Sequence, residues 1–433
     1  MTEKIQGMEN LVELHIKDFR AIASADIILN GITVVSGING AGKSTMSKLL
    51  YDVFKYANSF EELALQEANN ELLPRMSVLL QMYSFSTRTF HEGLSSAFRK
   101  YVFNSNTLSS FDDLPSFLAT VKQISKVFLE ALSDKEGGQK VNLTPRFRRI
   151  LGLNALDGMQ EIQAAVDDIR RQIQDIVVRA QKKCEERPLT ILKKRIVSDF
   201  NQFPNCEITE YGESILKQSR VPILHYIKKV LYVDTPMAIG LDPSSSLPQH
   251  WNDMNQVIRD AAHRGYNRSI NDILKNKILK GDIVYEKDDF YSVLKYKRED
   301  AQEFNLADCA TGIKSMALLQ LLLKNRFLDE NTLLIIDEPE AHLHPQWIIE
   351  YARILVLLQK KVKVKLFITS HSTDMVSAIK YISEKEKVQD KVSFYVANEK
   401  SKHKYTYSYL ENDIEPIFES FNKSFDILQN YVE

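Results

Sequence analysis

The sequence predicts an α/β fold with an N-terminal antiparallel β element and a large helical insertion. A glycine-rich turn at residues 37–42 joins an apolar, β-branched stretch to a helical pattern. A second apolar run ends in adjacent carboxylates at residues 337–338, as a buried parallel strand does. Between these two features, residues from about 55 to 205 show helical periodicity. These three observations predict an α/β core that is interrupted in sequence by a helical insertion.

Two short strands open the chain. An apolar residue at every second position is typical of a strand that is buried on one face. This pattern occurs at residues 12–16 and again at residues 25–29, after a bend at residues 20–24. We therefore expect two paired strands before the glycine-rich turn.

The turn itself has the pattern G-x-x-x-x-G-K-[ST] of a phosphate-binding loop, between a strand at residues 32–36 and a helix at residues 46–56. Its glycines let the backbone turn so that successive N–H groups point at phosphate oxygens, and the helix N-terminus adds its positive end. We assign nucleotide binding to Gly37, Asn39, Gly40, Ala41, Gly42, Lys43, Ser44 and Thr45.

Three side chains near this loop have individual roles in the prediction. Lys43 reaches the outer phosphates as a point charge and counts among the catalytic residues, and Ser44 offers its hydroxyl to Mg²⁺. Arg20 lies in the bend between the first two strands, and we assign it to the bound nucleotide. A solvated surface charge is the alternative for Arg20. The predicted cofactors are ATP and Mg²⁺.

The helical insertion is predicted to span residues 56–215, between a first part of the head at 1–55 and a second part at 216–433. Its most regular stretch is residues 159–180, where apolar residues keep a 3-4 spacing. This spacing favours a short coiled coil or helical hairpin, and an amphipathic helix packed on a globular core accounts for it equally well. Pro188 ends this helix, and another helical pattern follows at residues 189–203.

Basic clusters occur on the insertion at residues 146–149, 182–183 and 193–195. Such clusters can bind a phosphate backbone, which makes nucleic acid a candidate partner. Each cluster has acidic residues nearby, and a charge run is usually a solvated face.

The acidic pair at the end of the second apolar run completes the predicted site. Asp337 is placed to hold Mg²⁺, directly or through water, and Glu338 to orient or deprotonate the attacking water. Asp337 follows Lys43 by 294 residues, so a large segment is inserted between the two halves of one site. Further elements are predicted as strands at residues 221–235, 283–285, 290–296, 366–369, 392–396 and 405–410, and helices at residues 311–327 and 414–428.

The order of these motifs resembles the ABC-type ATPases of the SMC, RecF and OLD group. The resemblance is carried by Ile16–Arg20, the phosphate loop, Ala310–Ser315, the run D-E-P-E-A-H-L-H-P that begins at Asp337, and T-S-H-S at 369–372. Within the group, the short insertion and brief C-terminal part look most like the PtuA-like ATPase subunits of bacterial anti-phage systems.

The resemblance implies several further roles. In such proteins nucleotide lies between two heads, so Thr311, Gly312 and Lys314 would approach the γ-phosphate bound by a second copy, although a full L-S-G-G-Q signature is absent. His371 matches the catalytic switch histidine. His342 and His344 have the spacing of metal ligands, but a structural role is favoured because no third ligand is near in sequence. Gln66 and Gln81 are weak candidates for the glutamine that senses Mg²⁺.

The composition narrows the function. The net charge is -1, the three cysteines form no C-x-x-C pair, and no apolar run has the length of a membrane span. We therefore expect a cytoplasmic protein without a membrane partner. The expected function is an ATPase that forms a homodimer or higher homo-oligomer and controls a separate effector, a nuclease, without cutting DNA itself. The alternatives are an SMC- or RecF-like repair ATPase that acts on DNA directly and an ATP-binding scaffold with little turnover.

Overall fold

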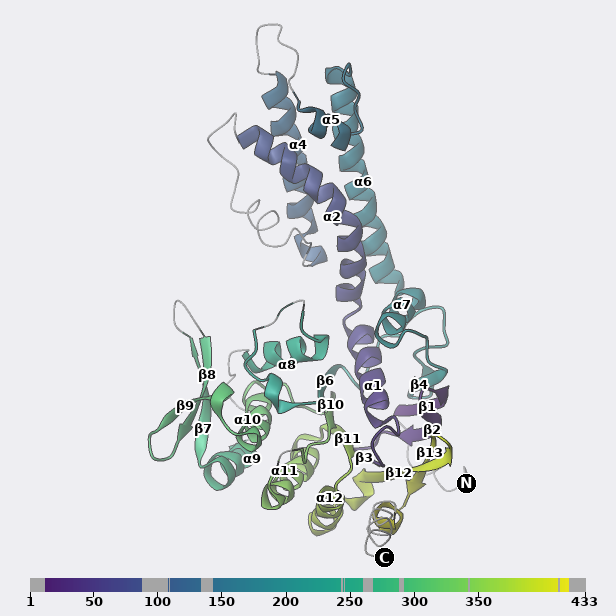
Figure 1. The fold of residues 1–433 in the computed structure, drawn as a ribbon, viewed down its shortest axis with the longest axis vertical. Coiled ribbons are helices and arrows are strands. Elements are labelled where there is room, and N and C mark those ends of the chain that lie inside the picture. Colours follow the sequence, from purple (N-terminus) through teal and green to yellow (C-terminus); the bar gives the residue numbers. More distant parts are fainter. Residues whose placement is uncertain are drawn as a thin grey trace, which may run out of the picture. The chain divides into compact units, whose positions relative to one another are not determined.

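The computed structural model describes residues 12–87, 108, 110–133, 143–242, 244, 246–259, 268–287, 292–341, 343–411 and 413–419. The chain forms two compact units (Figure 1). The first contains the residues up to Asn58 and those from Lys193 onward, and the second contains Ser59–Leu192. The second unit therefore begins and ends inside the range 56–215 that the sequence analysis gave to the insertion.

The first unit is built on a mixed sheet with the strand order β5-β4-β1-β2-β13-β12-β3-β11-β10-β6. Beside it the unit has a small antiparallel sheet with the order β7-β8-β9. The strands are β1 (Val12–Phe19), β2 (Ile22–Ile28), β3 (Ile32–Ser36), β4 (Cys206–Glu210), β5 (Glu213–Ser214), β6 (Lys229–Val233), β7 (Gly281–Lys287), β8 (Ser292–Arg298), β9 (Glu303–Asn305), β10 (Thr332–Asp337), β11 (Lys365–Ser370), β12 (Val392–Ser401) and β13 (Lys404–Leu410).

The N-terminal antiparallel element is confirmed, because β1 pairs with β2 in antiparallel register. The bend between them is shorter than predicted: β1 ends at Phe19 and β2 begins at Ile22. Arg20 makes this tight turn with a φ of 51°. The arrangement brings Arg20 to the end of β1 that faces the glycine-rich loop.

β12 is parallel to its neighbour β3, and the four strands that end the sheet order, β3-β11-β10-β6, are also parallel to one another. Their side chains are buried along nearly their whole length, which explains why their sequences are continuous apolar runs rather than alternating patterns. The carboxyl ends of parallel strands meet at one edge of a sheet. Ser36, Asp337 and Ser370 therefore end neighbouring strands at the same edge.

Helices cover this sheet in the first unit. They are α1 (Lys43–Asn58), the part of α7 (Leu189–Phe200) from Lys193 on, α8 (Gln249–Arg259), α9 (Arg268–Ile273), α10 (Thr311–Lys324), α11 (Pro345–Val362) and α12 (Thr373–Lys385), with the short helices η2 (Pro236–Ala238), η3 (Leu274–Leu279), η4 (Leu306–Asp308) and η5 (Gln389–Lys391). This combination of a mixed sheet, in which β12, β3, β11, β10 and β6 run parallel, with helices confirms the predicted α/β class.

Several predicted boundaries were wrong. The strand predicted at 221–235 is confined to β6, because the backbone N–H groups of His225 and Ile227 donate to the Glu210 carboxylate and not to a neighbouring strand. The helix predicted at 311–327 ends at Lys324. Residues 415–419 are helical, and the rest of the helix predicted at 414–428 lies outside the described residues.

The second unit contains α2 (Phe60–Thr87), η1 (Phe111–Asp113), α4 (Leu114–Ser133), α5 (Pro145–Ile150) and α6 (Met159–Glu186). The apolar seam of α6 is buried in a core that it shares with α2 and α4. The apolar side chains Phe117, Val121, Ile124 and Phe128 of α4 belong to the same core. The seam thus packs against α2 and α4 in a helical unit with its own core.

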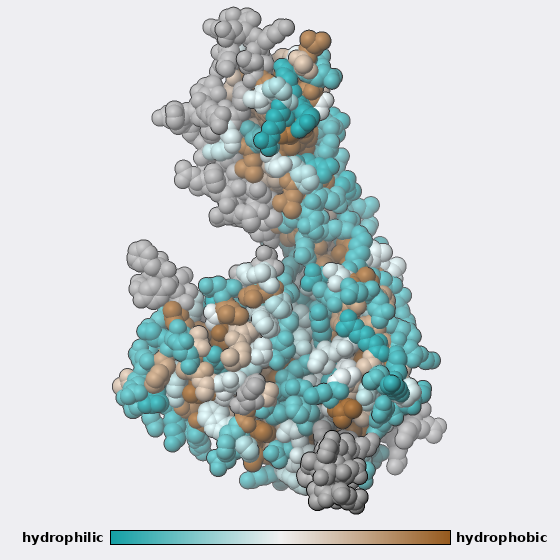
Figure 2. All heavy atoms as spheres, in the orientation of Figure 1, coloured by the Kyte–Doolittle hydropathy of each residue, from teal (hydrophilic) through white to brown (hydrophobic). Residues whose placement is uncertain are grey.

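The visible surface is mainly hydrophilic, with separate apolar patches (Figure 2). In the first unit the exposed large apolar side chains come from different elements, among them Ile223, Met237, Ile349 and Tyr381. Single exposed apolar residues are normal on protein surfaces. The described helices include no segment with the length and apolar character of a membrane span.

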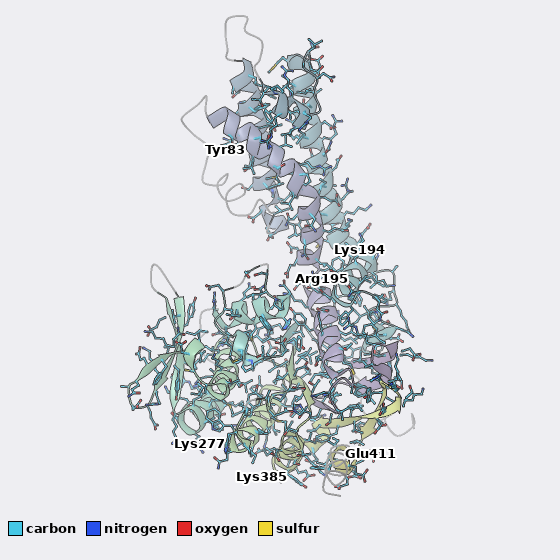
Figure 3. All side chains as sticks on the ribbon, in the orientation of Figure 1. Tyr83, Lys194, Arg195, Lys277, Lys385 and Glu411 are labelled. Carbon is cyan, nitrogen blue, oxygen red and sulfur yellow. The ribbon has the colours of Figure 1, made fainter. Side chains whose placement is uncertain are left out.

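A buried carboxylate lies between α1 and α7 in the first unit. Asp52 is 2% exposed, and its Oδ2 atom has no hydrogen-bond partner. Burial, reinforced by the charge of Asp199, raises the pKa of Asp52 to about 8. Arg195, labelled in Figure 3, stacks on Tyr56 with 4.9 Å between its guanidinium carbon and the ring centre.

This carboxylate predicts a pH-dependent stability. The pKa of Asp52 is 3.8 in the unfolded chain and about 8 in the folded protein, so the folded protein binds the Asp52 proton more tightly. The stability that this proton contributes is complete below pH 3.8 and is lost as the pH rises through about 8. Asp52→Asn should therefore raise the free energy of unfolding by about 1–3 kcal/mol at pH 8, and by less at pH 5. Urea unfolding at both pH values measures this. The exposed Asp272 gives the control Asp272→Asn, and equal gains from both variants would contradict the prediction.

Candidate nucleotide site

The glycine-rich loop needs glycine at two positions for steric reasons. Gly42 has a φ of +100°, and a Cβ there would lie 2.7 Å from Cγ1 of Ile22. A Cβ at Gly37 would lie 2.5 Å from the Cβ of Ala397. The loop can therefore pack tightly against β2 and β12 only with glycine at these positions. The hydroxyl of Tyr407 also donates to the Ala41 carbonyl oxygen at 2.8 Å, which fixes the loop from β13.

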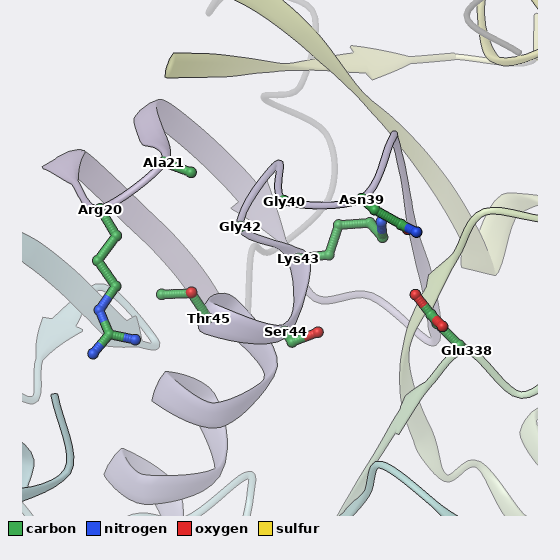
Figure 4. A pocket seen from close by; sticks show the side chains of 9 residues that line it. All are labelled: Arg20, Ala21, Asn39, Gly40, Gly42, Lys43, Ser44, Thr45 and Glu338. Atoms are coloured by element: carbon green, nitrogen blue, oxygen red, sulfur yellow. The ribbon is translucent and has the colours of Figure 1, made fainter. Parts of the chain in front are cut away.

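The loop lines a pocket of about 340 Å³ (Figure 4). Of the residues assigned to nucleotide from the sequence, those that line it are Arg20, Asn39, Gly40, Gly42, Lys43, Ser44 and Thr45. Ala21 and Glu338 complete the wall. The structure thus brings the phosphate loop and Glu338 to one pocket, although they are far apart in the sequence.

Arg20 borders this pocket but is engaged elsewhere. Its guanidinium donates to the carbonyl oxygen of Phe200 at 3.0 Å and lies 4.9 Å from the centre of the Phe200 ring. In Figure 4 its side chain extends away from Lys43. Arg20 is therefore neither a freely solvated charge nor, in this conformation, directed at the loop.

Lys43 is held on the inner side of the loop. Its Nζ donates to the carbonyl oxygens of Gly37 at 2.8 Å and Ile38 at 3.1 Å. Burial lowers the pKa of Lys43, and the negative charges of Glu338, Asp337 and Glu340 oppose that shift. The ammonium group thus lies where it can interact with both a phosphate in the loop and the acidic strand end.

Asp337 is 8% exposed and accepts hydrogen bonds on both carboxylate oxygens. The hydroxyls of Ser47 and Thr369 donate to Oδ1, the latter at 2.8 Å, and the Tyr232 hydroxyl donates to Oδ2 at 2.8 Å. Neither Ser47 nor Tyr232 was predicted as a site residue. Ser47 could have been found from its spacing, because it follows Lys43 by one helical turn and so lies on the same face of α1.

Glu338 and His371 lie side by side. Glu338 has a left-handed φ of 47°, and its N–H donates to the Thr369 carbonyl oxygen at 2.9 Å. Non-glycine residues in this region are uncommon and cluster at functional sites. Its Oε1 atom is 3.4 Å from Nδ1 of His371, and both side chains are partly exposed. The turn therefore presents Glu338 to the pocket with the imidazole beside it.

Glu340 holds the backbone at His371, and this role was not predicted from the sequence. Its Oε1 accepts from the backbone N–H of His371 at 2.9 Å and from the Ser370 hydroxyl at 2.8 Å. Its side chain is 5% exposed, and its Oε2 atom has no hydrogen-bond partner. Because Glu340 holds the backbone at His371, the position of the imidazole depends on this buried carboxylate.

The predicted signature residues at the start of α10 do not line the pocket of their own chain, and neither do Gly37, Ala41, Asp337 and His371. Thr311, Gly312 and Lys314 begin α10, where the Thr311 hydroxyl contacts the sulfur of Met237 at 3.6 Å. A Cβ at Gly312 would lie 3.2 Å from the Trp347 ring, and Lys314 is buried. An approach to nucleotide in a second copy remains the prediction for these residues.

The remaining candidates have other surroundings. His344 caps α11, where its Nδ1 accepts from the Gln346 N–H at 3.4 Å, and His342 lies outside the described residues. Gln66 and Gln81 lie on α2 of the second unit. No group of three or more His, Cys, Asp or Glu side chains among the described residues is arranged to hold a metal ion.

The donor set nonetheless fits a nucleotide with one Mg²⁺. Ser44 is exposed in the pocket, and Asp337 retains one lone-pair position after its three hydrogen bonds. A hydroxyl, a carboxylate and phosphate oxygens are hard oxygen ligands of the kind that Mg²⁺ uses together with water. Ser44 in the pocket wall and Asp337 at the neighbouring strand end therefore carry oxygen donors of the kind that a magnesium nucleotide uses.

Comparison with known proteins assigns the chain to a family. A family profile described as "AAA domain, putative AbiEii toxin, Type IV TA system" matches residues 32–377. Among curated proteins no match is found. Among solved structures, the chain is similar to the Smc head domain with an extended coiled coil from Pyrococcus furiosus, which is bound to the C-terminal domain of ScpA. The identity is 10%, the TM-score is 0.35, and the match covers 97% of this chain and 99% of that chain. For the SMC head domain from Thermotoga maritima the identity is 10%, the TM-score 0.37, and the coverage 92% and 98%.

Proposed function

Because this chain belongs to the family described as "AAA domain, putative AbiEii toxin, Type IV TA system", we propose that it hydrolyses ATP between two copies of itself and that its nucleotide state controls a separate nuclease effector in anti-phage defence. The chain has an α/β fold that carries a phosphate loop, with an inserted helical unit. The membership covers both halves of the head, since the match extends across the insertion.

One observation carries the ATPase assignment: the phosphate loop and Glu338 line the same pocket. The loop N–H groups and the N-terminus of α1 bind the phosphates, and Lys43 contributes a positive charge. Mg²⁺, when bound, neutralises charge on the phosphate oxygens. Ser44 and Asp337 are the side chains that would hold it. Glu338 orients the attacking water and accepts its proton.

His371 acts beside this base. Its Nδ1 atom lies 3.4 Å from a carboxylate oxygen of Glu338 and 3.5 Å from one of Glu340, so this edge of the ring faces the two acids. The other ring nitrogen remains able to contact the γ-phosphate. Glu340 keeps the ring in place through the backbone N–H of His371. This arrangement supports the switch role assigned to His371.

The homodimer part of the proposal is supported by the position of the signature residues. Thr311 and Gly312 begin α10 and are absent from the lining of their own pocket. A helix N-terminus favours negative charge. In the proposed dimer, Thr311, Gly312 and Lys314 of one copy approach the γ-phosphate that the other copy binds.

The effector part is supported by the description of the family, which joins an AAA domain to a putative toxin of a toxin–antitoxin system. A protein of that kind needs its harmful activity to be conditional. An ATPase whose nucleotide state controls a separate nuclease supplies such a condition. The resemblance to PtuA-like subunits points in the same direction, and the chain is proposed to act in the cytoplasm.

The proposal can be tested on the purified chain and on the assembly isolated from its own host. We expect the chain to release phosphate from ATP and to leave DNA intact with Mg²⁺ or Mn²⁺, while the isolated assembly cleaves nucleic acid in an ATP-dependent way. Cleavage by the chain alone, with a catalytically inactive Glu338→Gln preparation as the contamination control, would contradict the division between ATPase and nuclease.

The alternative, an ATPase that acts on DNA directly, depends on the basic clusters. Several of their members have intramolecular partners: Lys183 pairs with Glu67 at 2.7 Å, Arg195 with Asp199 at 3.2 Å, and Arg148 donates to two carbonyl oxygens at residues 154 and 157. These contacts favour a structural role for the clusters. If DNA raised the ATPase rate of the chain alone, with a salt dependence typical of phosphate contacts, the alternative would replace the effector proposal.

A further inference from the structure

Asp337 is held by hydroxyl groups from three different elements: Ser47 of α1, Tyr232 of β6 and Thr369 of β11. Two of these hydroxyls donate to Oδ1 and one, that of Tyr232, donates to Oδ2. A carboxylate has about four lone-pair positions. The three donors therefore leave Asp337 with one remaining position, on the oxygen that Tyr232 contacts.

We propose that Tyr232 is a positioning residue of the metal site: its hydroxyl fixes the Asp337 carboxylate so that the one remaining lone pair of Oδ2 serves Mg²⁺, directly or through water. This inference rests on the assignment of Asp337 to Mg²⁺ in the proposed function. It assigns Tyr232 no contact with nucleotide. Tyr232 acts on the metal only through the orientation of Asp337.

The sheet places the two side chains on one face. In the parallel pairing of β6 with β10, Tyr232 lies opposite Ile335. Asp337 is two residues beyond Ile335, and side chains two residues apart in a strand point to the same face. Tyr232 is 5% exposed, and its hydroxyl donates to Oδ2 of Asp337 at 2.8 Å.

Residues at the start of α8 fix the tyrosine ring. The imidazole of His250 lies against it, with 4.7 Å between ring centres and 33° between the planes. Nε2 of His250 is hydrogen-bonded to Oδ2 of Asp234 at 2.9 Å, and the indole N–H of Trp251 donates to Oδ1 of Asp234 at 2.7 Å. Asp234 follows β6 directly, so α8 is tied to the end of the strand that carries Tyr232. The hydroxyl position is thus determined by packing on one side and by Asp337 on the other.

The same cluster contains a matched tyrosine. Tyr51 lies one turn after Ser47 on α1, its ring centre is 6.0 Å from that of Tyr232, and it is 1% exposed. Its hydroxyl donates to Oδ2 of Asp253 at 2.8 Å, and Asp253 also pairs with Lys55 at 3.0 Å. Tyr51 therefore resembles Tyr232 in burial and bonding, but its hydroxyl contacts a carboxylate that is outside the metal site.

The test compares Tyr232→Phe with Tyr51→Phe by titration calorimetry of ATP, once with Mg²⁺ and once with EDTA. Each variant loses one hydroxyl and keeps its ring. We expect the gain in ATP affinity that Mg²⁺ produces to fall about tenfold in Tyr232→Phe, the lower end of effects known for groups that orient metal ligands. In Tyr51→Phe the gain should stay within twofold of the unmodified chain. The affinity in EDTA should be the same for both variants.

Asp337→Asn separates this inference from the proposed function. If Asp337→Asn keeps the full effect of Mg²⁺, then Asp337 does not serve the metal, and the metal assignment and the inference both fail. If Asp337→Asn loses the effect while Tyr232→Phe behaves like Tyr51→Phe, the role of Tyr232 alone is overturned. Should Tyr232→Phe fail to fold, Ser47→Ala removes a donor from the other oxygen of the same carboxylate. A normal magnesium effect in that variant would then count against positioning by these hydroxyls.

Discussion

Lys43→Ala should abolish measurable ATP binding, with an affinity at least about 100-fold below that of the unmodified chain, because a charge-assisted contact to phosphate is lost in a buried site. The Lys43 ammonium is held by the carbonyl oxygens of Gly37 and Ile38, within the loop that binds the phosphates. The substitution also removes the cation that lies near the negative charges of Glu338 and Asp337. Nucleotide would then meet an acidic strand end without compensation. Titration calorimetry with ATP and Mg²⁺ measures the loss.

Lys48→Ala is the matched control for this experiment. Lys48 lies on the same helix, and its ammonium is 5.4 Å from the centre of the Phe200 ring, outside the residues that line the pocket. We expect Lys48→Ala to bind ATP within about threefold of the unmodified chain, as a surface change away from the site should. Unchanged ATP affinity in Lys43→Ala would remove the phosphate-loop assignment itself.

The parts of the fold that could be predicted are those with contiguous signals. The strand, glycine-rich loop and helix around Lys43 follow one another in the sequence, so propensity and spacing were sufficient to predict all three. The central strands were predicted for the same reason, because a strand buried on both faces is a continuous apolar run. The pairing of β4 with β1 was not predicted, since it joins residues 206–210 to residues 12–16 and depends on tertiary structure.

The site could be predicted only in part, for a related reason. Lys43, Asp337, Glu338 and His371 lie in motifs that can be identified locally. Tyr232 and Glu340 act through contacts that no local pattern marks: Tyr232 precedes Asp337 by 105 residues, and Glu340 acts through its bond to the backbone of His371. A side chain that orients another side chain is brought to it by the three-dimensional packing, so the distance between the two residues in the sequence follows no fixed spacing.

For Arg20 the sequence predicted the region of the side chain but not its direction. The sequence placed Arg20 near the loop, and it does line the pocket, but its guanidinium is hydrogen-bonded to the end of α7. The contact depends on Phe200, which is 180 residues further along the chain. Proximity in sequence indicated the right region, whereas the direction of the side chain is set by an aromatic ring from a distant element.

Glu338→Gln should keep ATP binding, reduce hydrolysis by a factor of about 10²–10⁴, and stabilise the pair of heads with ATP between them. The amide has nearly the same shape but cannot accept the proton of the attacking water. Because the left-handed turn at Glu338 is fixed by its N–H bond to Thr369, the substitution should leave the pocket intact. Phosphate release measures the rate, and light scattering after size-exclusion chromatography measures association with ATP and without it.

Glu350→Gln provides the control, because Glu350 pairs with Arg353 at 3.4 Å on α11 and does not line the pocket. It should change neither the rate nor the association. The two measurements on Glu338→Gln test separate links of the mechanism. A normal rate would show that another group activates the water. A slow rate without ATP-dependent association would instead preserve Glu338 as the base and remove the second copy from the site, so that Thr311, Gly312 and Lys314 would lose their proposed role.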